Sequence, residues 1–366
     1  MKDYTNDLRT VLTLDAGGTN FVFSAIRGNR EAVAPVRMDS GAHDLDLCLK
    51  TMEQGFGAVL QALDERPVAI SFAFPGPADY ENGVIGDLPN LPAFRGGVAL
   101  KGFLEERFGL PVYINNDGNL YAYGEALAGT LPWLNAQLAA AGNQKRYRNL
   151  IGVTLGTGFG AGVVLNGELL TGDNGCGGDV WVFRDLYHPE MIAEESVSIH
   201  AVRRMYAELS GTSADVSPKD ICDIAAGRRE GHREAAVETW KRFGHGLGNA
   251  LCYALTLIDG VVAIGGGLSG AAPFFVPAML EEMRGEMQRF GQSGVPRLQM
   301  DVYNLNDAGD LAAMLRREAT EVGVPGSGRR VPYVCAKKTG VMVSSLSTSL
   351  AINLGAYNFA LNELDR

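Results

Sequence analysis

The sequence predicts an α/β protein of two domains that face each other across a cleft. Two similar segments, at residues 11–26 and 149–165, each read as an apolar strand, a glycine–threonine turn and a second apolar strand. A third segment, at 261–270, reads as a buried strand that enters a glycine-rich turn before a helix. Because the second hairpin stands at the start of the second half of the chain, we expect two halves built on related plans.

Length and composition agree with a two-domain globular protein. At 366 residues the chain is long for one hydrophobic core, and its 47 glycines indicate many turns and close backbone approaches. The net charge of −10, without a run of Lys or Arg, argues against nucleic acid or an anionic membrane as a partner. No apolar run has the length of a membrane span and no signal peptide is recognisable, so we expect a cytoplasmic protein with free cysteine thiols.

The first hairpin has the features of a phosphate-binding turn. Gly17 and Gly18 leave the backbone accessible to a ligand, and successive N–H groups up to Thr19 can form a nest for an anion. Asp15, at the end of the first strand, could hold a hydrated Mg²⁺ ion. An ordinary glycine-rich hairpin with an aspartate in its turn is the alternative for this stretch alone.

Hydrophobic periodicity and turn residues predict the remaining elements. The loop Pro75-Gly76-Pro77 follows a strand end, the place where open α/β sheets position ligand loops. Residues 130–147 read as an inserted loop or helix pair. Further strands are expected at 32–38, 67–74, 110–115, 297–303, 331–335 and 339–343. Further helices are expected at 43–63, 97–108, 191–209, 218–226, 233–257, from 273, at 307–322 and at 347–361.

Two carboxylates stand out for their positions. Asp117 lies where a strand gives way to a helix, so it could cap that helix or accept a proton from an attacking hydroxyl. Its neighbours Asn116 and Asn119 add hydrogen-bonding groups that a plain cap does not require. Glu194 and Ser198 are four residues apart, so in a helix over 191–209 they would share a face. A stabilising acidic first turn is the alternative for Glu194.

His188 and His200 have no partners at metal-ligand spacing, so we expect ordinary surface or structural histidines.

The ordered motifs identify a family. LDAGGTN at 14–20, FPGP at 74–77, DLPN at 87–90, NNDGN at 115–119, LGTGFGAG at 155–162 and IGGGLSG at 264–270 together resemble the ROK family. These are bacterial sugar kinases of the actin, Hsp70 and hexokinase superfamily. The resemblance covers most of residues 11–270 and the last helix. It implies two ribonuclease-H-like (actin/hexokinase-type) α/β domains flanking a cleft, a smaller one from 1–118 with 345–366 and a larger one from 119–344.

The resemblance also implies roles for individual residues. In that family the first two glycine loops bind the phosphates and Mg²⁺, the third binds adenosine, and the aspartate of the Asn-Asp pair is the catalytic base, here Asp117. The nucleotide-binding positions are Asp15 (also on the Mg²⁺ side, through water), Gly17, Gly18, Thr19, Gly156, Thr157, Gly158, Gly265, Gly266 and Gly267. The sugar-binding positions are Asn90, Asn116, Asp117, Asp179 and Glu194.

Two segments depart from the family pattern. The family commonly has Ala-Gly-Glu-x-Gly-His followed by a cysteine-rich zinc loop, whereas residues 177–181 read Gly-Gly-Asp-Val-Trp. Asp179 would therefore replace the glutamate, no structural zinc is expected, and packing of Trp181 and Phe183 is the candidate to hold the 170–195 loop. The stretch between Leu268 and Thr339 is longer than the family usually has.

These observations predict ATP- and Mg²⁺-dependent phosphorylation of a hexose or N-acetylhexosamine, at the 6-hydroxyl and with a glucose-type sugar favoured. The expected partners are the sugar and ATP, and the resemblance allows a homodimer. A sugar-responsive regulator is one alternative, opposed by the charge and by the ten residues that precede the first strand. A catalytically silent sugar-binding protein is the other, opposed by Asp15, Asp117 and the Gly-Thr-Gly loop.

Overall fold

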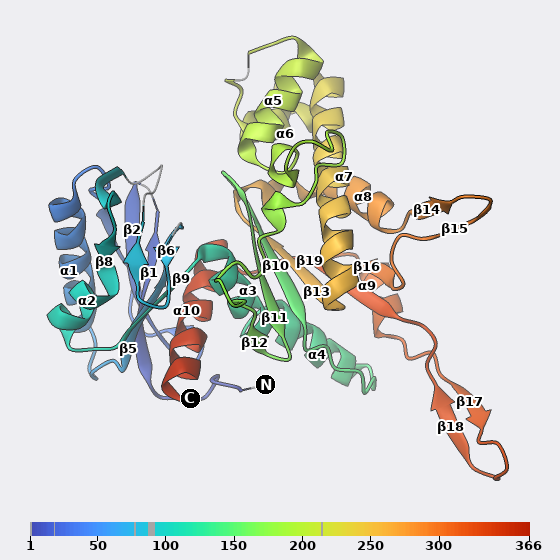
Figure 1. The fold of residues 1–366 in the computed structure, drawn as a ribbon, viewed down its shortest axis with the longest axis horizontal. Helices are drawn as coiled ribbons and strands as arrows, with labels where there is room; N and C mark the ends of the chain where they lie inside the picture. The colour runs from blue at the N-terminus through green and yellow to red at the C-terminus, as the bar shows by residue number, and fades with distance from the viewer. Residues whose placement is uncertain (1, 18, 77, 87–91, 214) are drawn as a thin grey trace. The chain divides into compact units, whose positions relative to one another are not determined.

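The chain forms two compact units, and both are α/β, as predicted (Figure 1). The computed structural model describes residues 2–17, 19–76, 78–86, 92–213 and 215–366. Unit 1 consists of Met1–Pro132, Ala161–Gly178 and Ser345–Arg366, and unit 2 of Trp133–Gly160 and Asp179–Ser344. No helix within these described ranges combines the length and apolar character that a membrane span requires.

Unit 1 is built on a mixed sheet with the strand order β3-β2-β1-β5-β9, to which β4 adds through β2. The predicted first hairpin is confirmed: β1 and β2 are antiparallel, and β1, β5 and β9 run parallel. The expected strand at 32–38 is shorter because it starts after Pro35, which has no N–H to donate. The strands are β1 (Thr10–Ala16), β2 (Asn20–Arg27), β3 (Arg30–Glu31), β4 (Val36–Asp39), β5 (Ala69–Ala73), β9 (Val112–Asn115) and the small sheet β6 (Ala78–Asp79), β7 (Val84–Ile85) and β8 (Val98–Ala99).

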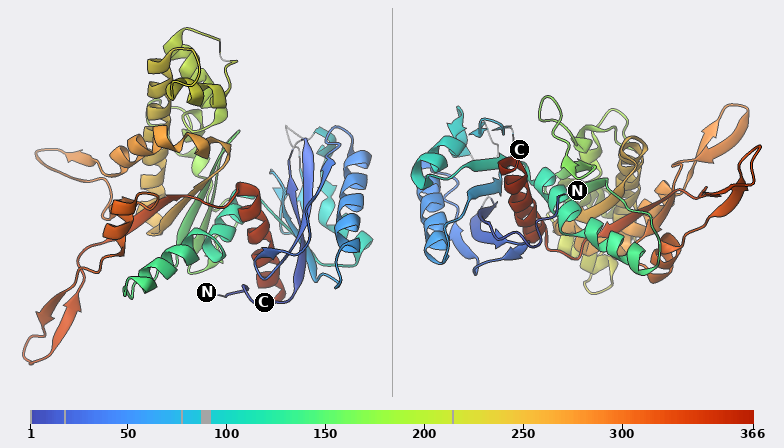
Figure 2. Two further views of the ribbon diagram at one scale, coloured as in Figure 1. Left: turned by 180° about the vertical axis from the view of Figure 1, so that it is seen from behind. Right: turned by 90° about the horizontal axis from the view of Figure 1, so that it is seen from below.

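Helices cover both faces of this sheet (Figure 2). On one face lie α1 (Leu45–Gln61) and α2 (Leu100–Phe108), and on the other α10 (Thr348–Leu364), which packs on β1, β5 and β9. Because both faces are covered, the central strand β5 is buried at each of its residues.

The helix α3 (Asp117–Leu127) packs closely against α10, and two glycines make that approach possible. A Cβ atom at Gly124 would lie 1.9 Å from the carbonyl oxygen of Ala351, and one at Gly355 would lie 1.8 Å from that of Leu120. Glycine at both positions therefore sets how near α3 lies to the last helix.

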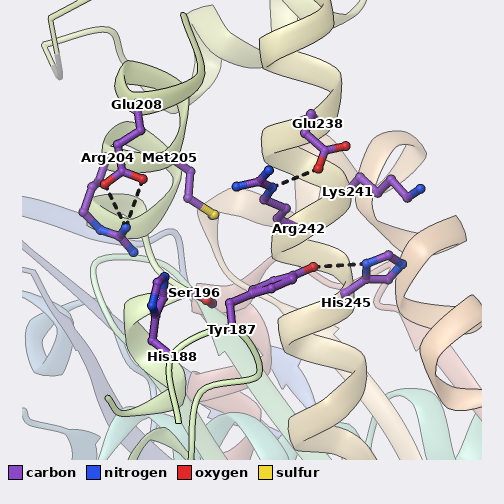
Figure 3. Close-up of a pocket in the computed structure, with 10 residues that line it drawn as sticks. All are labelled: Tyr187, His188, Ser196, Arg204, Met205, Glu208, Glu238, Lys241, Arg242 and His245. Carbon is purple, nitrogen blue, oxygen red and sulfur yellow. Dashed lines mark hydrogen bonds and ion pairs between the residues drawn. The ribbon is translucent and has the colours of Figure 1, made fainter. Parts of the chain in front are cut away.

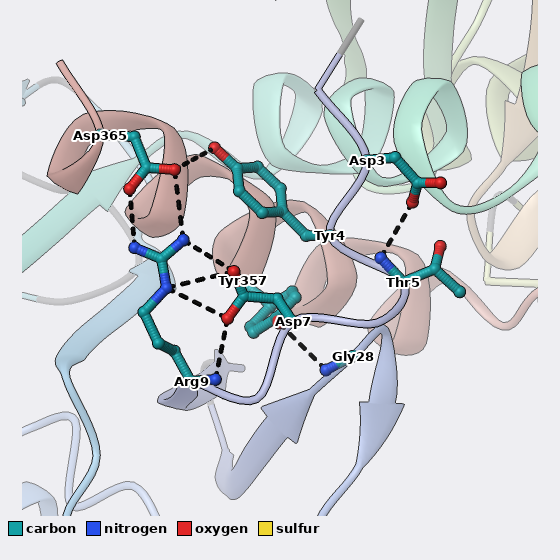
Figure 4. Close-up of polar contacts among 8 residues, drawn as sticks. All are labelled: Asp3, Tyr4, Thr5, Asp7, Arg9, Gly28, Tyr357 and Asp365. Carbon is teal, nitrogen blue, oxygen red and sulfur yellow. Dashed lines mark hydrogen bonds and ion pairs between the residues drawn. The ribbon is translucent and has the colours of Figure 1, made fainter.

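The N-terminal segment is tied to the end of α10 by ion pairs (Figure 4). The guanidinium of Arg9 lies 2.7 Å from both Asp7 and Asp365, and the Tyr4 hydroxyl donates to Asp365 at 3.0 Å. The Tyr357 hydroxyl accepts from the N–H of Gly28 at 3.0 Å. These contacts join the two ends of the chain within unit 1.

Unit 2 is built on four parallel strands in the order β10-β13-β19-β16, and β11 returns beside β10 to complete the predicted second hairpin. The long helix α7 packs against α5, α6 and α8. The strands of unit 2 are β10 (Leu150–Leu155), β13 (Val261–Gly265), β16 (Asp301–Asn304) and β19 (Lys338–Val343). The strand β11 (Phe159–Leu165) begins in unit 2 and continues in unit 1, to which β12 (Glu168–Leu169) belongs. The helices are α4 (Thr130–Ala140), α5 (Ile199–Ser210), α6 (Pro218–Ala225), α7 (Arg233–Ile258), α8 (Ala272–Met283) and α9 (Ala308–Leu315), with 3-10 turns η1 (Pro92–Phe94) in unit 1 and η2 (Val180–Val182), η3 (Ala193–Glu195) and η4 (Gly267–Ala271) in unit 2.

The long stretch before β19 contains two hairpins that project from unit 2 (Figure 1). They are β14 (Glu286–Arg289) with β15 (Gln292–Pro296), and β17 (Thr320–Gly323) with β18 (Arg330–Tyr333). The helix expected over 307–322 is wrong after residue 315, because residues 320–323 pair with 330–333 instead. The segment 130–147 contains the single helix α4 rather than a helix pair.

The glycine contact between α3 and α10 makes Gly124→Ala strongly destabilising. We expect a loss of about 1–3 kcal/mol or more in the free energy of unfolding, because backbone must move to admit the methyl group. Gly102→Ala is the matched control, since it lies in α2 with open space at its Cβ position and should gain up to about 1 kcal/mol. Urea unfolding of both variants checks this, and equal midpoints would contradict the close packing.

Candidate active site

Asp117 is the first residue of α3, directly beyond the carboxyl end of β9. The capping role falls on its neighbour: the Asn116 side chain accepts a hydrogen bond from the N–H of Asn119 at 2.6 Å. Asp117 itself accepts only the N–H of Gly118, at 2.9 Å, among the hydrogen bonds of the described residues. Its carboxylate is exposed and is therefore available for chemistry.

Two buried asparagines fix the backbone on either side of Asp117. Asn115 and Asn119 are 4% and 2% exposed. The Asn115 side-chain oxygen accepts both the N–H of Asn116 and the side-chain amide of Asn119, each at 2.9 Å. The sequence predicts no role for Asn115, although the spacing of four between Asn115 and Asn119 is a signal for a contact at the start of a helix.

The surroundings of Asp117 favour its protonated form. Desolvation by the surrounding protein raises the pKa of the Asp117 carboxyl above its ordinary value of 3.8, and the negative charge of Asp15 raises it further. The N–H of Gly118 opposes this shift, because a donor stabilises the carboxylate. A carboxylate with a raised pKa is a stronger base than an ordinary aspartate.

Asp15 lies on the same edge of the sheet. It pairs in register with Ala73 of β5, which pairs with Asn115 of β9. Two strand spacings therefore separate the backbone of Asp15 from that of Asn115, about 10 Å. The Ser349 hydroxyl donates to the Asp15 carboxylate.

A single carboxylate beside a turn of backbone N–H groups fits Mg²⁺, which keeps several waters and binds one or two carboxylates together with substrate phosphates. In this turn the N–H of Gly17 donates to the carbonyl of Asn20 at 3.1 Å, and the carbonyl of Thr19 accepts from Ser40 at 3.0 Å. Gly18 and Asn90 lie outside the described residues.

In unit 2 the second and third glycine loops lie next to each other. They follow the adjacent parallel strands β10 and β13, in which Thr154 pairs with Gly265. Gly266 has φ +92°, and a Cβ there would lie 2.3 Å from the backbone nitrogen of Leu155. Within the second loop the N–H of Gly156 donates to the carbonyl of Gly158 at 3.1 Å, and Thr157 is exposed. The structure thus brings Gly156–Gly158 and Gly265–Gly267 to one edge of the sheet.

Glu194 lies against the second glycine loop. Its carboxylate accepts the N–H of Phe159 at 2.8 Å, and a Cβ at Gly158 would be 2.7 Å from the same carboxylate oxygen. The expected helix over 191–209 is wrong at its start: Glu194 belongs to η3, and α5 begins at Ile199. Ser198 is the reason, because its side chain accepts from the N–H of Ala201 and caps the helix there. Glu194 and Ser198 therefore do not share a helical face.

The segment that departs from the family pattern has little apolar packing. Asp179 is exposed and its side chain makes no cap bond to η2. Phe183 packs edge-on against Tyr253 of α7, with ring centroids 6.0 Å apart, whereas Trp181 is 39% exposed. The expected packing thus holds for Phe183 and is wrong for Trp181.

Other metal-ligand candidates in the described chain are isolated. His188 and His200 are exposed, as expected, and the five cysteines are free thiols. Within the ranges that the structure describes, no three His, Cys, Asp or Glu side chains gather as a metal site would require.

Comparisons with known proteins agree with these motifs. A family model described as the ROK family matches residues 11–181. The chain is similar to a glucokinase of Parabacteroides distasonis, with 55% identity, a TM-score of 0.88 and coverage of 98% of this chain and 99% of that one. It is 26% identical to a glucokinase of Thermotoga maritima, over 75% of this chain and 86% of the relative. It is 29% identical to an N-acetyl-D-glucosamine kinase of Vibrio cholerae, over 70% of this chain and 83% of the relative.

The raised pKa of Asp117 has a consequence for stability. Since the folded state disfavours the carboxylate, stability from this group is greatest below pH 3.8 and is lost as the pH rises through the raised pKa. Asp117→Asn should therefore melt at a higher temperature than wild type at pH 7, and this gain should shrink at pH 4.

Asp7→Asn is the control of opposite sign. The hydrogen bonds from Arg9 hold the pKa of Asp7 below its ordinary value, so this group stabilises at neutral pH and the stabilisation is lost as the pH falls. Differential scanning fluorimetry at both pH values checks the pair. A gain for Asp117→Asn that grows at pH 4 would contradict the assigned direction.

Proposed function

This chain belongs to the ROK family and is a sugar kinase, and we propose that it transfers the γ-phosphoryl group of ATP to the 6-hydroxyl of a glucose-type hexose. The observation that carries the choice of sugar is the 55% identity to the Parabacteroides distasonis glucokinase over nearly the whole chain. Relatives named N-acetyl-D-glucosamine kinase make N-acetylhexosamines the alternative acceptors.

In this proposal Asp117 is the general base. It accepts the proton of the sugar hydroxyl as that oxygen attacks the γ-phosphorus. The exposed carboxylate, held at the start of α3 by its backbone and by buried asparagines, supports the role. Phosphoryl transfer passes through a loose transition state, so catalysis depends mostly on position and charge, and a fixed base supplies the remaining proton transfer.

The sugar would be held by hydrogen bonds from neighbouring groups. The Asn116 side-chain oxygen caps α3, so its amide N–H groups are the part that would donate to a sugar hydroxyl. Asn90, Asp179 and Glu194 complete the proposed sugar-binding set.

The phosphates would bind to the backbone N–H groups of the two glycine–threonine turns, and the adenosine to the backbone at Gly265–Gly267. Mg²⁺, when bound, would neutralise charge on the β- and γ-phosphates. Asp15 would hold it through water. We also propose that the smaller domain (1–118 with 345–366) and the larger one (119–344) close on the substrates and exclude water, which would limit ATP hydrolysis.

A panel of hexoses and N-acetylhexosamines in a coupled ADP-release assay tests this function. We expect glucose to give the highest kcat/KM, and Asp117→Ala to reduce kcat about 10²- to 10⁴-fold, because the proton acceptor is lost. Asp64→Ala, an exposed carboxylate beyond α1, is the control and should keep the wild-type rate.

Absence of turnover with every sugar would refute the proposed reaction. Calorimetric sugar binding without turnover would instead favour a silent sugar-binding protein.

The metal role of Asp15 is tested separately. Chelation of Mg²⁺ should abolish turnover, and Asp15→Asn should raise the Mg²⁺ concentration for half-maximal rate about 10- to 100-fold, because an oriented water ligand is lost. Ser349→Ala should shift it in the same direction but less, since it removes only the hydrogen bond to Asp15. An unchanged Mg²⁺ dependence in Asp15→Asn would remove this residue from the site.

A further inference from the structure

We propose that residues 183–193 form a clip that holds Glu194 against the second glycine loop, and that Asp185 is the positioning residue of this clip. The consequence for turnover rests on the proposed function. The geometric part concerns only unit 2 and can be measured without substrate.

The carboxylate of Asp185 is the centre of the clip. It is 4% exposed, and its Oδ1 accepts the backbone N–H groups of both Tyr187 and His188 at 2.8 Å. Its Oδ2 is buried and has no hydrogen-bond partner among the described residues. A carboxylate that accepts two N–H groups fixes a tight turn through charge-assisted bonds, which are stronger than neutral ones.

Backbone hydrogen bonds close the segment around that turn. The N–H of Asp185 donates to the carbonyl of Met191 at 3.0 Å. The N–H of Met191 donates to the carbonyl of His188 at 2.8 Å. The N–H of Ala193 donates to the carbonyl of Phe183 at 2.7 Å. The clip is therefore a closed loop whose last residue immediately precedes Glu194.

Apolar burial holds this loop only in part, since Phe183, Leu186 and Ile192 are half-buried. Four large apolar side chains in and beside it are 39–51% exposed, and hydrophobic stabilisation scales with the area removed from water. They are Trp181, Val182, Tyr187 and Met191. The buried carboxylate is therefore the group that fixes the turn of the clip, through the N–H groups of Tyr187 and His188.

The clip is fastened to α7 at two points. One is the aromatic contact of Phe183 with Tyr253. The other is a chain of polar groups that starts where the Tyr187 hydroxyl lies 3.1 Å from Nδ1 of His245 (Figure 3). The Nε2 of His245 lies 3.4 Å from the carboxylate of Glu281. Burial raises the pKa of Tyr187 to about 12, so at neutral pH its hydroxyl is protonated and can donate to His245.

Around these two points the clip is not packed solidly. Tyr187 and His188 line a cavity of about 450 Å³ over α5 and α7, together with Arg204 and Arg242, which pair with glutamates of their own helices (Figure 3). Because the cavity leaves one side of the turn unsupported, we expect loss of the turn at Asp185 to loosen the clip up to Ala193.

Such a displacement would reach the glycine loop directly. Glu194 follows Ala193 and accepts the N–H of Phe159 at 2.8 Å, so it fixes the residue after Gly158. The N–H of Ile199 donates to the carbonyl of Gly156 at 2.9 Å, which ties the far end of the same segment to the other end of the loop. The glycine loop is thus clamped by the two ends of residues 194–199.

Amide hydrogen exchange at Phe159 tests the geometric claim without any substrate. Asp185→Ala should accelerate this exchange at least about 10-fold, because Glu194 no longer protects the amide, whereas Asp185→Asn keeps the Oδ1 acceptor and should restore most of the protection. Asp3→Ala is the matched control. Asp3 also accepts the N–H of the residue two positions later, Thr5, but it lies near the N-terminus, so its loss should leave Phe159 exchange unchanged. Unchanged exchange in Asp185→Ala would overturn the proposal.

Kinetics with glucose then separate positioning from general stability. Asp185→Ala should lower kcat/KM about 10- to 100-fold, as misplacement of a binding group does. In a Glu194→Ala background, Asp185→Ala should cause no further loss of kcat/KM, because both substitutions remove the same interaction of Glu194. Multiplicative losses in the double variant would show that Asp185 does not act through Glu194 and would overturn the proposal.

A second variant covers the case in which Asp185→Ala fails to fold. Tyr187→Phe removes only the bond to His245 and should shift Phe159 exchange and kcat/KM in the same direction by about 2- to 5-fold, the loss of one modest hydrogen bond. Wild-type values for both would overturn the proposal. Accelerated exchange in a protein that phosphorylates no sugar would support the clip while refuting the proposed function.

Discussion

The position of Asp117 depends on how the chain satisfies the backbone groups at the start of α3. The first N–H groups of a helix have no partner within it, and here Asn116 supplies one through its side chain. The buried side chain of Asn115 accepts hydrogen bonds from the backbone N–H of Asn116 and from the side-chain amide of Asn119. An unpaired polar group in such a buried position would cost about 1–3 kcal/mol. Since its neighbours carry the capping, the carboxylate of Asp117 is needed by the fold only as the acceptor of the Gly118 N–H among the described hydrogen bonds.

That helix start is in turn fixed by packing further along α3. Gly124 and Gly355 let α3 and α10 approach until backbone meets backbone, and α10 lies on the strands that end at Asp15 and Asn115. The two carboxylates at this sheet edge suit different roles, with the backbone of Asp15 about 10 Å from that of Asn115, two residues before Asp117. One would hold the metal through water, and the other, with its raised pKa, would take a proton.

The local sequence carried most of what could be predicted. Glycine–threonine turns between apolar strands and the strand-to-helix junction at Asp117 are properties of a few adjacent residues, and the structure has both hairpins and that junction. The sequence does not locate the start of α5, because Ser196, Ser198 and two glutamates all suit the first turn of a helix. In the structure the hydrogen bond from the N–H of Ala201 makes Ser198 the cap. The clip at 183–193 and the strand pair β17–β18 are closed by hydrogen bonds across irregular turns, which hydrophobic periodicity does not reveal.

The proposed role of Asp117 as proton acceptor in phosphoryl transfer can be tested by single-turnover phosphorylation of glucose as a function of pH. In wild type the rate constant of phosphoryl transfer should rise with pH as one group loses its proton. The pKa of that group should lie above 3.8, because the surroundings of Asp117 raise its pKa. In Asp117→Asn the small residual rate should show no such ionisation. The same pH dependence in the variant would contradict this role of Asp117, because the ionising group would then be another residue.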